Sequence, residues 1–251
     1  MMSSDINPFN LMGKTILVTG ASSGIGRAVC IACASMGATI CLTARNELRL
    51  EETKKMLSGN KHVLFPADLT LHENVVKLVS ALPDLDGIVH CAGIIDRVPC
   101  RLITEANIQE IFSPNFFSPV LLQSELLNRK KVKKASSIIF MSSRAASTPA
   151  VGNAIYSASK GAILSYAKVL ALELAPQLVR VNCICPAMVW TNLILQGVFS
   201  EDDFKEAQSK YPLKRYGQPE DVANLCLYLL SDASLWMTGS SIDLTGGSES
   251  L

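Results

Sequence analysis

The fold is decided by one stretch near the N-terminus, Thr15-Ile16-Leu17-Val18-Thr19-Gly20-Ala21-Ser22-Ser23-Gly24-Ile25-Gly26. Its first five residues form a short apolar run that predicts a buried strand. The glycines allow a sharp turn, and the apolar pattern of residues 24–36 predicts a helix directly after it. A helix that begins in such a turn presents free N–H groups and a positive dipole end to a pyrophosphate. The stretch therefore indicates a dinucleotide site, with a tight turn that binds nothing as the alternative.

Short apolar runs recur along the rest of the chain and alternate with longer helical patterns such as residues 154–175. Further strands are predicted at Thr39–Thr43, His62–Pro66, Gly87–Cys91, Ser137–Ser142, Val179–Ile184 and Ser241–Leu244. Most of these runs lack a polar face, which is typical of parallel strands covered on both sides. The alternation predicts right-handed crossovers, and hence an α/β fold: a Rossmann-like, doubly wound, seven-stranded parallel sheet with helices on both faces. We expect an N-terminal arm at residues 1–12 and one domain at 13–251.

Composition excludes several classes of function. The chain has 251 residues, 49% of them hydrophobic and 18% charged, and its formal net charge is +1. No broad basic field is available for nucleic acid or an anionic membrane. Residues 1–10 are polar and lack the core of a signal peptide, and no apolar run reaches the ~18 residues of a membrane span. We expect a cytoplasmic protein that binds neither nucleic acid nor a membrane.

The chain contains eight cysteines, and Cys30 and Cys33 form a Cys-x-x-Cys pair. A redox pair opens a helix, where the thiol pKa is lowered, whereas this pair is expected about one turn inside a helix. No second cysteine or histidine pair with zinc spacing accompanies it, so no metal site is predicted. The favoured interpretation is that six cysteines in apolar stretches are small core residues: Cys30, Cys33, Cys41, Cys91, Cys183 and Cys185.

The spacing Thr-Gly-x-x-x-Gly-x-Gly resembles the short-chain dehydrogenase/reductase family, and the resemblance extends from Lys14 to Gly247. Within that family the chain looks similar to 3-oxoacyl-[acyl-carrier-protein] reductases. The resemblance implies that the glycine-rich loop binds the diphosphate of a nicotinamide cofactor. The residues implicated are Gly20, Ser22, Ser23, Gly24, Ile25 and Gly26.

The end of the second strand indicates which cofactor is bound. An acidic residue there would pair with the free ribose hydroxyls of NAD, but Ala44 occupies the position and Arg45 follows it. A guanidinium fits a 2′-phosphate, so NADP(H) is favoured over NAD, with a surface arginine as the alternative. By resemblance, Asp68 and Leu69 border the adenine. From the residues alone, Asp68 is otherwise read as the cap of the next helix.

Two further segments carry cofactor residues by resemblance. The family writes Asn-Asn-Ala-Gly where this chain has His90-Cys91-Ala92-Gly93, so the ribose contacts of Cys91, Ala92 and Gly93 are expected from the backbone. His90 is interpreted as structural and not as a base. After the sixth strand the family pattern Pro-Gly-x-x-x-Thr becomes Pro186-Ala187-Met188-Val189-Trp190-Thr191. The resemblance assigns Pro186, Val189 and Thr191 to the nicotinamide end.

Tyr156 and Lys160 are spaced to share one face of a helix. A nearby ammonium favours the phenolate, so we expect Lys160 to lower the pKa of Tyr156. A phenol that can give a proton beside a hydride acceptor is what carbonyl reduction requires. Ser143 precedes Tyr156 by the spacing of the family's catalytic serine, with Ser142 as the fallback. By resemblance, Asn115 holds a water in a proton relay to Lys160; the alternative is a helix cap.

The resemblance implies an NADP(H)-dependent oxidoreductase, most simply a 3-oxoacyl reductase. The alternatives are a dehydrogenase for a sugar, steroid or other small alcohol, and a dinucleotide-binding regulator without turnover. The substrate is expected to be a small-molecule or acyl-carrier-linked carbonyl. The basic run 128–134, expected to end a helix, is a weak hint of an acidic acyl carrier protein, and a solvated helix end is the favoured interpretation.

Residues 191–216 form the longest stretch between a strand and the next helix and are expected to contribute a substrate loop. Its apolar residues suggest a lid: Leu193, Ile194, Leu195, Val198 and Phe199. Relatives form dimers or tetramers through the helices predicted at residues 117–129 and 152–175, so a homo-oligomer is expected. Four apolar residues suit such a face or, equally, the sheet: Leu164, Ala167, Leu170 and Ala171.

Overall fold

The computed structural model describes residues 7–148, 150–191 and 206–248. These residues contain one parallel sheet of seven strands in the order β3-β2-β1-β4-β5-β6-β7. The strands are β1 (Thr15–Thr19), β2 (Thr39–Ala44), β3 (Val63–Pro66), β4 (Leu85–His90), β5 (Val132–Met141), β6 (Arg180–Pro186) and β7 (Ser241–Leu244). The predicted doubly wound sheet is confirmed. Because every strand is parallel, the carboxyl ends of all seven lie at one edge of the sheet.

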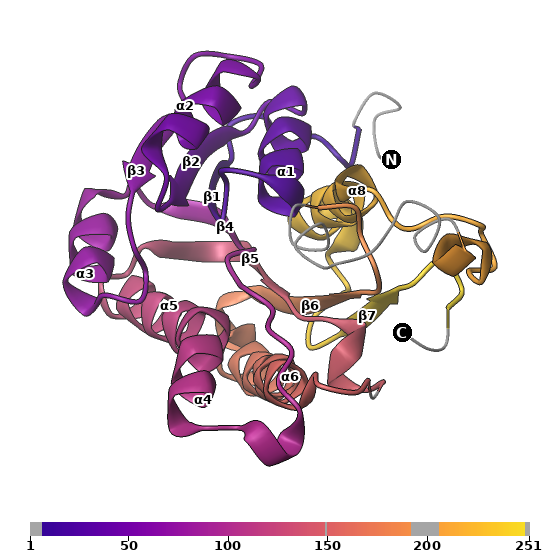
Figure 1. The fold of residues 1–251 in the computed structure, drawn as a ribbon. Coiled ribbons are helices and arrows are strands. Elements are labelled where there is room, and N and C mark those ends of the chain that lie inside the picture. The colour runs from indigo at the N-terminus through magenta and orange to yellow at the C-terminus, as the bar shows by residue number, and fades with distance from the viewer. Residues whose placement is uncertain (1–6, 149, 192–205, 249–251) are drawn as a thin grey trace.

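Helices cover both faces of this sheet (Figure 1). One layer contains α1 (Gly24–Ser35), α2 (Glu47–Lys55) and α8 (Pro219–Leu230). The other contains α3 (His72–Ala81), α4 (Glu105–Phe112), α5 (Ser118–Asn128) and α6 (Ala154–Leu174). A π-helical turn, η2 (Ser113–Phe117), joins α4 to α5. Short 3-10 turns are η1 (Cys100–Leu102), η3 (Arg144–Ala146), η4 (Ala175–Gln177) and η5 (Asp232–Ser234).

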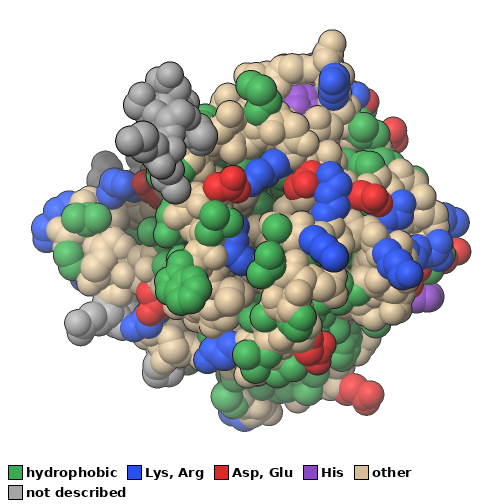
Figure 2. All heavy atoms as spheres, turned by 180° about the vertical axis from the view of Figure 1, so that it is seen from behind, with side chains coloured by type: hydrophobic (Ala, Val, Ile, Leu, Met, Phe, Trp, Pro, Cys, Tyr) green, Lys and Arg blue, Asp and Glu red, His purple; other side chains and the backbone are tan. Residues whose placement is uncertain are grey.

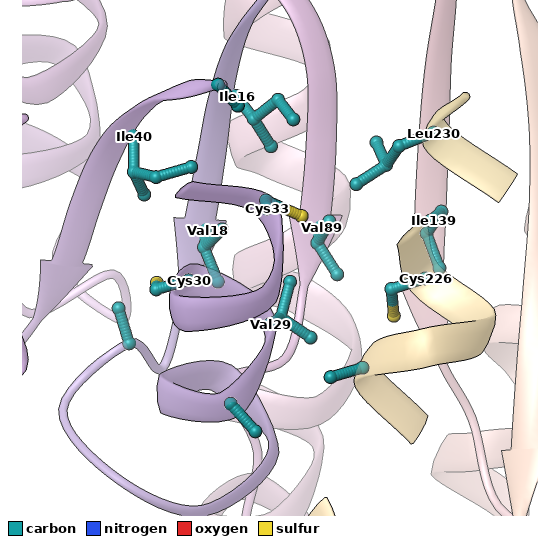
Figure 3. Close-up of a cluster of buried hydrophobic side chains, with 14 of the residues drawn as sticks. Ile16, Val18, Val29, Cys30, Cys33, Ile40, Val89, Ile139, Cys226 and Leu230 are labelled. Atoms are coloured by element: carbon teal, nitrogen blue, oxygen red, sulfur yellow. The ribbon is translucent and has the colours of Figure 1, made fainter. Parts of the chain in front are cut away.

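Two apolar cores lie on the two faces of the sheet. In the first, α1 and α8 place Val29, Cys30 and Cys226 against Val18 of β1 and Ile139 of β5 (Figure 3). The second lies under α3, α5 and α6. Cores of this kind are what the strands' continuous apolar runs require, because neither face of the sheet meets water.

The cysteines behave as core residues. Of the six in apolar stretches, five are buried and Cys91 is partly exposed, and all eight are free thiols. Burial raises the pKa of Cys33 to about 12, and it raises that of Cys30 as well. A redox pair needs the opposite shift. The interpretation of Cys30 and Cys33 as small apolar residues is therefore confirmed.

The basic run departs from its prediction. Helix α5 ends at Asn128, Lys130 turns the chain with φ 54°, and residues 132–134 already belong to β5, where Val132 pairs with Leu85. A local helical pattern cannot show this long-range pairing. Lys131 donates to the Leu82 carbonyl over 2.6 Å. Because β5 has 10 residues, its first residue, within the run, lies about 30 Å from the carboxyl end of the strand.

The surface and the longest helices add three observations. Basic and acidic side chains are interspersed across the face drawn in Figure 2. No helix within the described residues has the length and apolar character needed to cross a membrane. Ala167, Leu170 and Ala171 are buried in the core beneath α6, and Leu164 packs against it. Of the two orientations open for these four residues, the structure therefore shows the one that faces the sheet.

Candidate active site

The glycine-rich turn after β1 is a close-packed cradle. A methyl group built on Gly26 would lie 2.3 Å from the Gly20 carbonyl oxygen, and one on Gly20 would lie 2.9 Å from the Ala92 nitrogen. Gly20 also has φ 64°, which disfavours any side chain. Only glycine fits at these two positions. The turn therefore places backbone without side chains at the start of α1, where a diphosphate could approach it closely.

The start of α1 is free to bind an anion. Ser23 is the N-cap residue, and its hydroxyl makes no capping hydrogen bond to the helix. Ser22, Gly24 and Ile25 are each partly exposed around it. Uncapped N–H groups at a helix start carry partial positive charge and attract phosphate. The residues present thus fit the diphosphate of a dinucleotide.

A strand-end threonine that sequence reasoning passed over ties this loop to its neighbour. The Thr19 hydroxyl is buried and accepts a 3.1 Å hydrogen bond from the Ala92 N–H. This bond holds the partly exposed segment of Cys91, Ala92 and Gly93 beside the turn. The signal in the sequence was a polar residue at the end of an otherwise apolar strand, a position where a buried hydroxyl needs a partner.

Arg45 and Asp68 lie close together at the carboxyl ends of β2 and β3. Arg45 is exposed. Burial raises the pKa of Asp68, but hydrogen bonds from Thr70 and the charge of Arg45 outweigh it, and the net pKa is lowered. Asp68 does not cap α3, whose N-cap residue is Leu71; it accepts instead from the Thr70 N–H at 3.0 Å and the Thr70 hydroxyl at 2.7 Å. Leu69 is buried beside it.

Asn115 lies buried in the π-helical turn η2, where Pro114 is accommodated in the first turn. Its side-chain oxygen accepts from the Ile94 N–H at 2.8 Å, and its amide donates to the Ile94 carbonyl at 2.9 Å. The same amide donates to the Ser159 hydroxyl on α6 at 3.1 Å. Asn115 therefore joins the loop after β4 to α6 and does not cap a helix.

The two serines after β5 face different ways. Ser142 is buried, and its hydroxyl donates to the Lys160 backbone carbonyl over 2.9 Å. Ser143 is partly exposed, and its side chain acts on the Tyr156 phenol, whose pKa it lowers against the effect of burial. Its oxygen also accepts from the Ala145 N–H at 3.1 Å, which leaves its proton for the phenol. The geometry favours Ser143 over Ser142 as the partner of Tyr156.

Lys160 is buried beneath the same face of α6. Its ammonium lies 5.9 Å from the centre of the Tyr156 ring and donates to the Met141 carbonyl over 2.9 Å. Burial lowers the pKa of Lys160 to about 8. Gly93 leaves the space beside it open, since a methyl group there would lie 3.3 Å from the Lys160 nitrogen and 2.9 Å from the Asn115 oxygen. Lys160, Asn115 and the segment that contains Gly93 are thus brought together.

The pKa of Tyr156 departs from the prediction. Burial raises this pKa, and the influence of Ser143, which acts in the opposite direction, does not outweigh burial. Lys160 makes no resolved contribution to this shift. The prediction that Lys160 lowers the pKa of Tyr156 is therefore wrong for the protein without a bound cofactor. Helical spacing shows which side chains share a face, but it does not show how far burial removes each of them from water.

The segment after β6 closes the other side of the site. Pro186 ends the strand, and Thr191 reaches the glycine turn, where a methyl group on Gly24 would lie 3.2 Å from the Thr191 methyl carbon. Val189 is buried. Ala187 does not have a positive φ, so the alanine that replaces the family's glycine fits without strain. The suggested lid residues, from Leu193 to Phe199, lie outside the described residues.

His90 is a buried structural residue. Its ring stacks on Phe140 with centroids 4.5 Å apart, and its Nε2 lies 3.2 Å from the Gln123 side-chain oxygen. Burial lowers the pKa of His90 to about 4, so the ring is neutral at neutral pH. The core position under α5 supports the structural interpretation over a catalytic base.

The chain is similar in sequence and in fold to several known proteins. A family model described as enoyl-(acyl carrier protein) reductase matches residues 20–249. The chain is 34% identical to L-xylulose reductase of Caenorhabditis elegans, over 95% of this chain and 97% of that protein. It is 35% identical to the chloroplastic NADPH-dependent aldehyde reductase 1 of Arabidopsis thaliana, over 98% and 90% respectively. A solved short-chain dehydrogenase/reductase of Brucella melitensis, a glucose/ribitol dehydrogenase, superposes with a TM-score of 0.89 at 30% identity, over 96% and 98%.

Proposed function

Because this chain belongs to the short-chain dehydrogenase/reductase family and is an NAD(P)-dependent oxidoreductase of alcohols and carbonyls, we propose that it is an NADPH-dependent carbonyl reductase. When bound, the reduced nicotinamide supplies a hydride to the carbonyl carbon. The carbonyl oxygen then needs one proton to become an alcohol. In this proposal the chain's own residues bind that oxygen and deliver the proton.

The grouping of Ser143, Tyr156 and Lys160 carries the proposal: the Ser143 side chain acts on the Tyr156 phenol, and the Lys160 ammonium lies 5.9 Å from the centre of the same ring. Tyr156 donates its phenolic proton to the substrate oxygen, while the Ser143 hydroxyl bonds the same oxygen and stabilises its developing charge. The buried Lys160 ammonium is at this distance from the Tyr156 ring, and in this proposal it stabilises the resulting phenolate once the cofactor is bound beside both groups. Asn115 positions this group by fixing the loop at Ile94 against α6.

The choice of NADPH is part of the proposal and rests on charge. Arg45 is an exposed cation directly after β2, and it follows Ala44, the position from which an acid would repel a 2′-phosphate. Its guanidinium makes no hydrogen bond to another described residue, so it is available to an anion. The similar Arabidopsis protein is named for its use of NADPH. Ser22 lies partly exposed in the glycine turn as a second donor. In this proposal the glycine-rich turn binds the diphosphate, and Asp68 and Leu69 border the adenine. Pro186, Val189 and Thr191 contact the nicotinamide end.

For the substrate, we favour a small aldehyde or ketose over a carrier-linked acyl chain. Two of the relatives that are similar over nearly their whole length are named for L-xylulose and aldehyde reduction. The family model's description names a carrier-linked enoyl substrate and not a 3-oxo group, so it supports the second candidate, a 3-oxoacyl thioester, only through the shared acyl carrier protein. The basic run beginning at residue 128 does not favour that candidate, since it lies at the opposite end of β5 from Ser143.

Self-association through α5 and α6 is also proposed. Apolar side chains remain exposed on these helices at Leu121, Val169 and Leu172. Exposed apolar residues gathered on adjoining helices are typical of subunit contacts. Light scattering at micromolar concentration should give twice or four times the mass of one chain, and a monomer would contradict the proposal.

A substrate panel tests the function. Purified protein is mixed with NADPH and, in turn, a ketose, a small aldehyde, a steroid ketone and a 3-oxoacyl thioester, and the loss of reduced nicotinamide absorbance is followed. Turnover of the ketose or aldehyde is expected. Tight NADPH binding with no turnover of any member would instead favour a dinucleotide-binding regulator.

A further inference from the structure

Residues 215–217 hold residues 188–190, the segment proposed to meet the nicotinamide, through backbone contacts. Val189 and Gly217 form a parallel bridge. The Gly217 N–H donates to the Met188 carbonyl at 3.0 Å, and the Trp190 N–H donates to the Gly217 carbonyl at 2.8 Å. A methyl group on Gly217 would lie 3.3 Å from a Val189 methyl carbon, so the two backbones are in close contact. Residues 188–190 therefore take their position from Gly217.

An ion pair in turn fixes Gly217. Arg215 donates to the two carboxylate oxygens of Asp221 at 2.5 and 3.0 Å, and also to the Tyr216 carbonyl at 3.0 Å. Asp221 accepts a further 2.7 Å hydrogen bond from the Gln218 N–H. The residues on both sides of Gly217 are thus bound to one pair. A two-pronged guanidinium–carboxylate contact defines orientation as well as distance.

Aromatic rings support the same segment. The Tyr216 ring meets Trp190 edge-on at 5.5 Å and Tyr211 at 5.2 Å. The Tyr211 hydroxyl accepts from the Met188 N–H at 3.4 Å. Thr191, at the far end of the segment, lies against the glycine turn. Residues 188–191 therefore contact the glycine turn at one end and the segment held by the Arg215–Asp221 pair at the other.

We propose that the Arg215–Asp221 ion pair is a positioning element that orients residues 188–191 toward the nicotinamide half of the cofactor, without affecting the adenosine half. This inference rests on the proposed function, because it requires an NADPH site in which Val189 and Thr191 meet the nicotinamide. In the proposed site the adenosine half is bound by Arg45, Asp68 and the glycine turn, none of which contacts the Arg215–Asp221 pair. The two halves of the ligand can therefore be tested separately.

The test compares the whole cofactor with a fragment of it. Binding of NADPH and of 2′,5′-ADP, which lacks nicotinamide, is measured by calorimetry for the wild type, Arg215→Met and Arg215→Lys. Arg215→Met keeps the Asp221 bond that caps α8 while removing the pair. We expect NADPH to bind about fivefold more weakly to Arg215→Met, because losing a partly exposed ion pair of good geometry has an effect of about this size. The affinity for 2′,5′-ADP should be roughly unchanged. Arg215→Lys, which keeps the charge without the fork, should fall between.

The matched control is Lys133→Met, which removes a similarly exposed ion pair to Asp86, 2.9 Å long, at the other end of the sheet. It should change neither affinity. Equal losses for NADPH and 2′,5′-ADP in Arg215→Met, or no loss of either, would overturn the positioning inference and leave the proposed function standing. A wild type that binds neither ligand would overturn the proposed function, and the inference with it.

Discussion

Ser142 and Lys160 are joined by a 2.9 Å hydrogen bond from the serine hydroxyl to the lysine backbone carbonyl, which fastens the end of β5 to α6. The next residue, Ser143, instead acts on the Tyr156 phenol, whose pKa it lowers against the effect of burial. Neighbouring serines thus have different partners.

Ser142→Ala should lower the free energy of unfolding by about 1 kcal/mol, because a buried hydrogen bond is lost, while turnover persists. Ser143→Ala should lower turnover about a hundredfold with little change in stability. Urea unfolding and steady-state rates measured on both variants distinguish the two, and a reversed pattern would show that Ser142 is the substrate's partner.

Removing the phenol of Tyr156 should abolish chemistry and spare binding. Tyr156→Phe is expected to lose at least about a hundredfold in turnover, since only the transferable proton is deleted, while NADPH affinity is kept. Tyr166→Phe is the matched control: Tyr166 lies on the same helix but packs edge-on against Phe140 in the core. Near wild-type turnover in Tyr156→Phe would mean that another group supplies the proton.

Arg45 should decide the choice of cofactor. The double variant Ala44→Asp with Arg45→Ala replaces a cation that attracts the 2′-phosphate with an acid that repels it. The ratio of kcat/KM for NADPH over NADH should fall about tenfold to a hundredfold, the worth of one charge-assisted hydrogen bond. Arg49→Ala, which removes an exposed arginine from α2, serves as the control. A wild type that already prefers NADH would show that Arg45 is a solvated strand-end residue.

His90 should make the protein sensitive to acid. Burial lowers its pKa in the folded protein to about 4, against an ordinary value of 6.5. Between these values the unfolded chain binds a proton that the folded protein does not, so stability is lost as pH falls from 6.5 toward 4. The loss should approach about 3 kcal/mol. Urea unfolding as a function of pH should show a shallower decline for His90→Asn, and equal slopes would indicate that the buried imidazole accepts a proton without cost.

The local parts of the fold could be predicted because their causes are local. Strand β1 has the predicted limits, Thr15 and Thr19, because an apolar run bounded by glycine has few other solutions. Helix α1 follows at once for the same reason. Strand β5 was predicted too short, since its start depends on pairing with Leu85, a residue 47 positions earlier (132 − 85). Pairing between distant segments leaves no periodic signal.

Helical spacing placed Tyr156 and Lys160 on one face of a helix, and the family resemblance added Ser143, which follows a strand whose carboxyl end lies at the edge where such sheets bind ligands. The sequence by itself determined the doubly wound sheet, the glycine cradle and the edge at which the site lies. Only the tertiary structure decided which of two serines meets the phenol, that Ala167 and Leu170 face the sheet, and that burial raises the pKa of Tyr156 while lowering that of Lys160. The physical reason is that backbone pattern is set by neighbours along the chain, whereas side-chain direction and lost hydration are set by segments that meet only after folding.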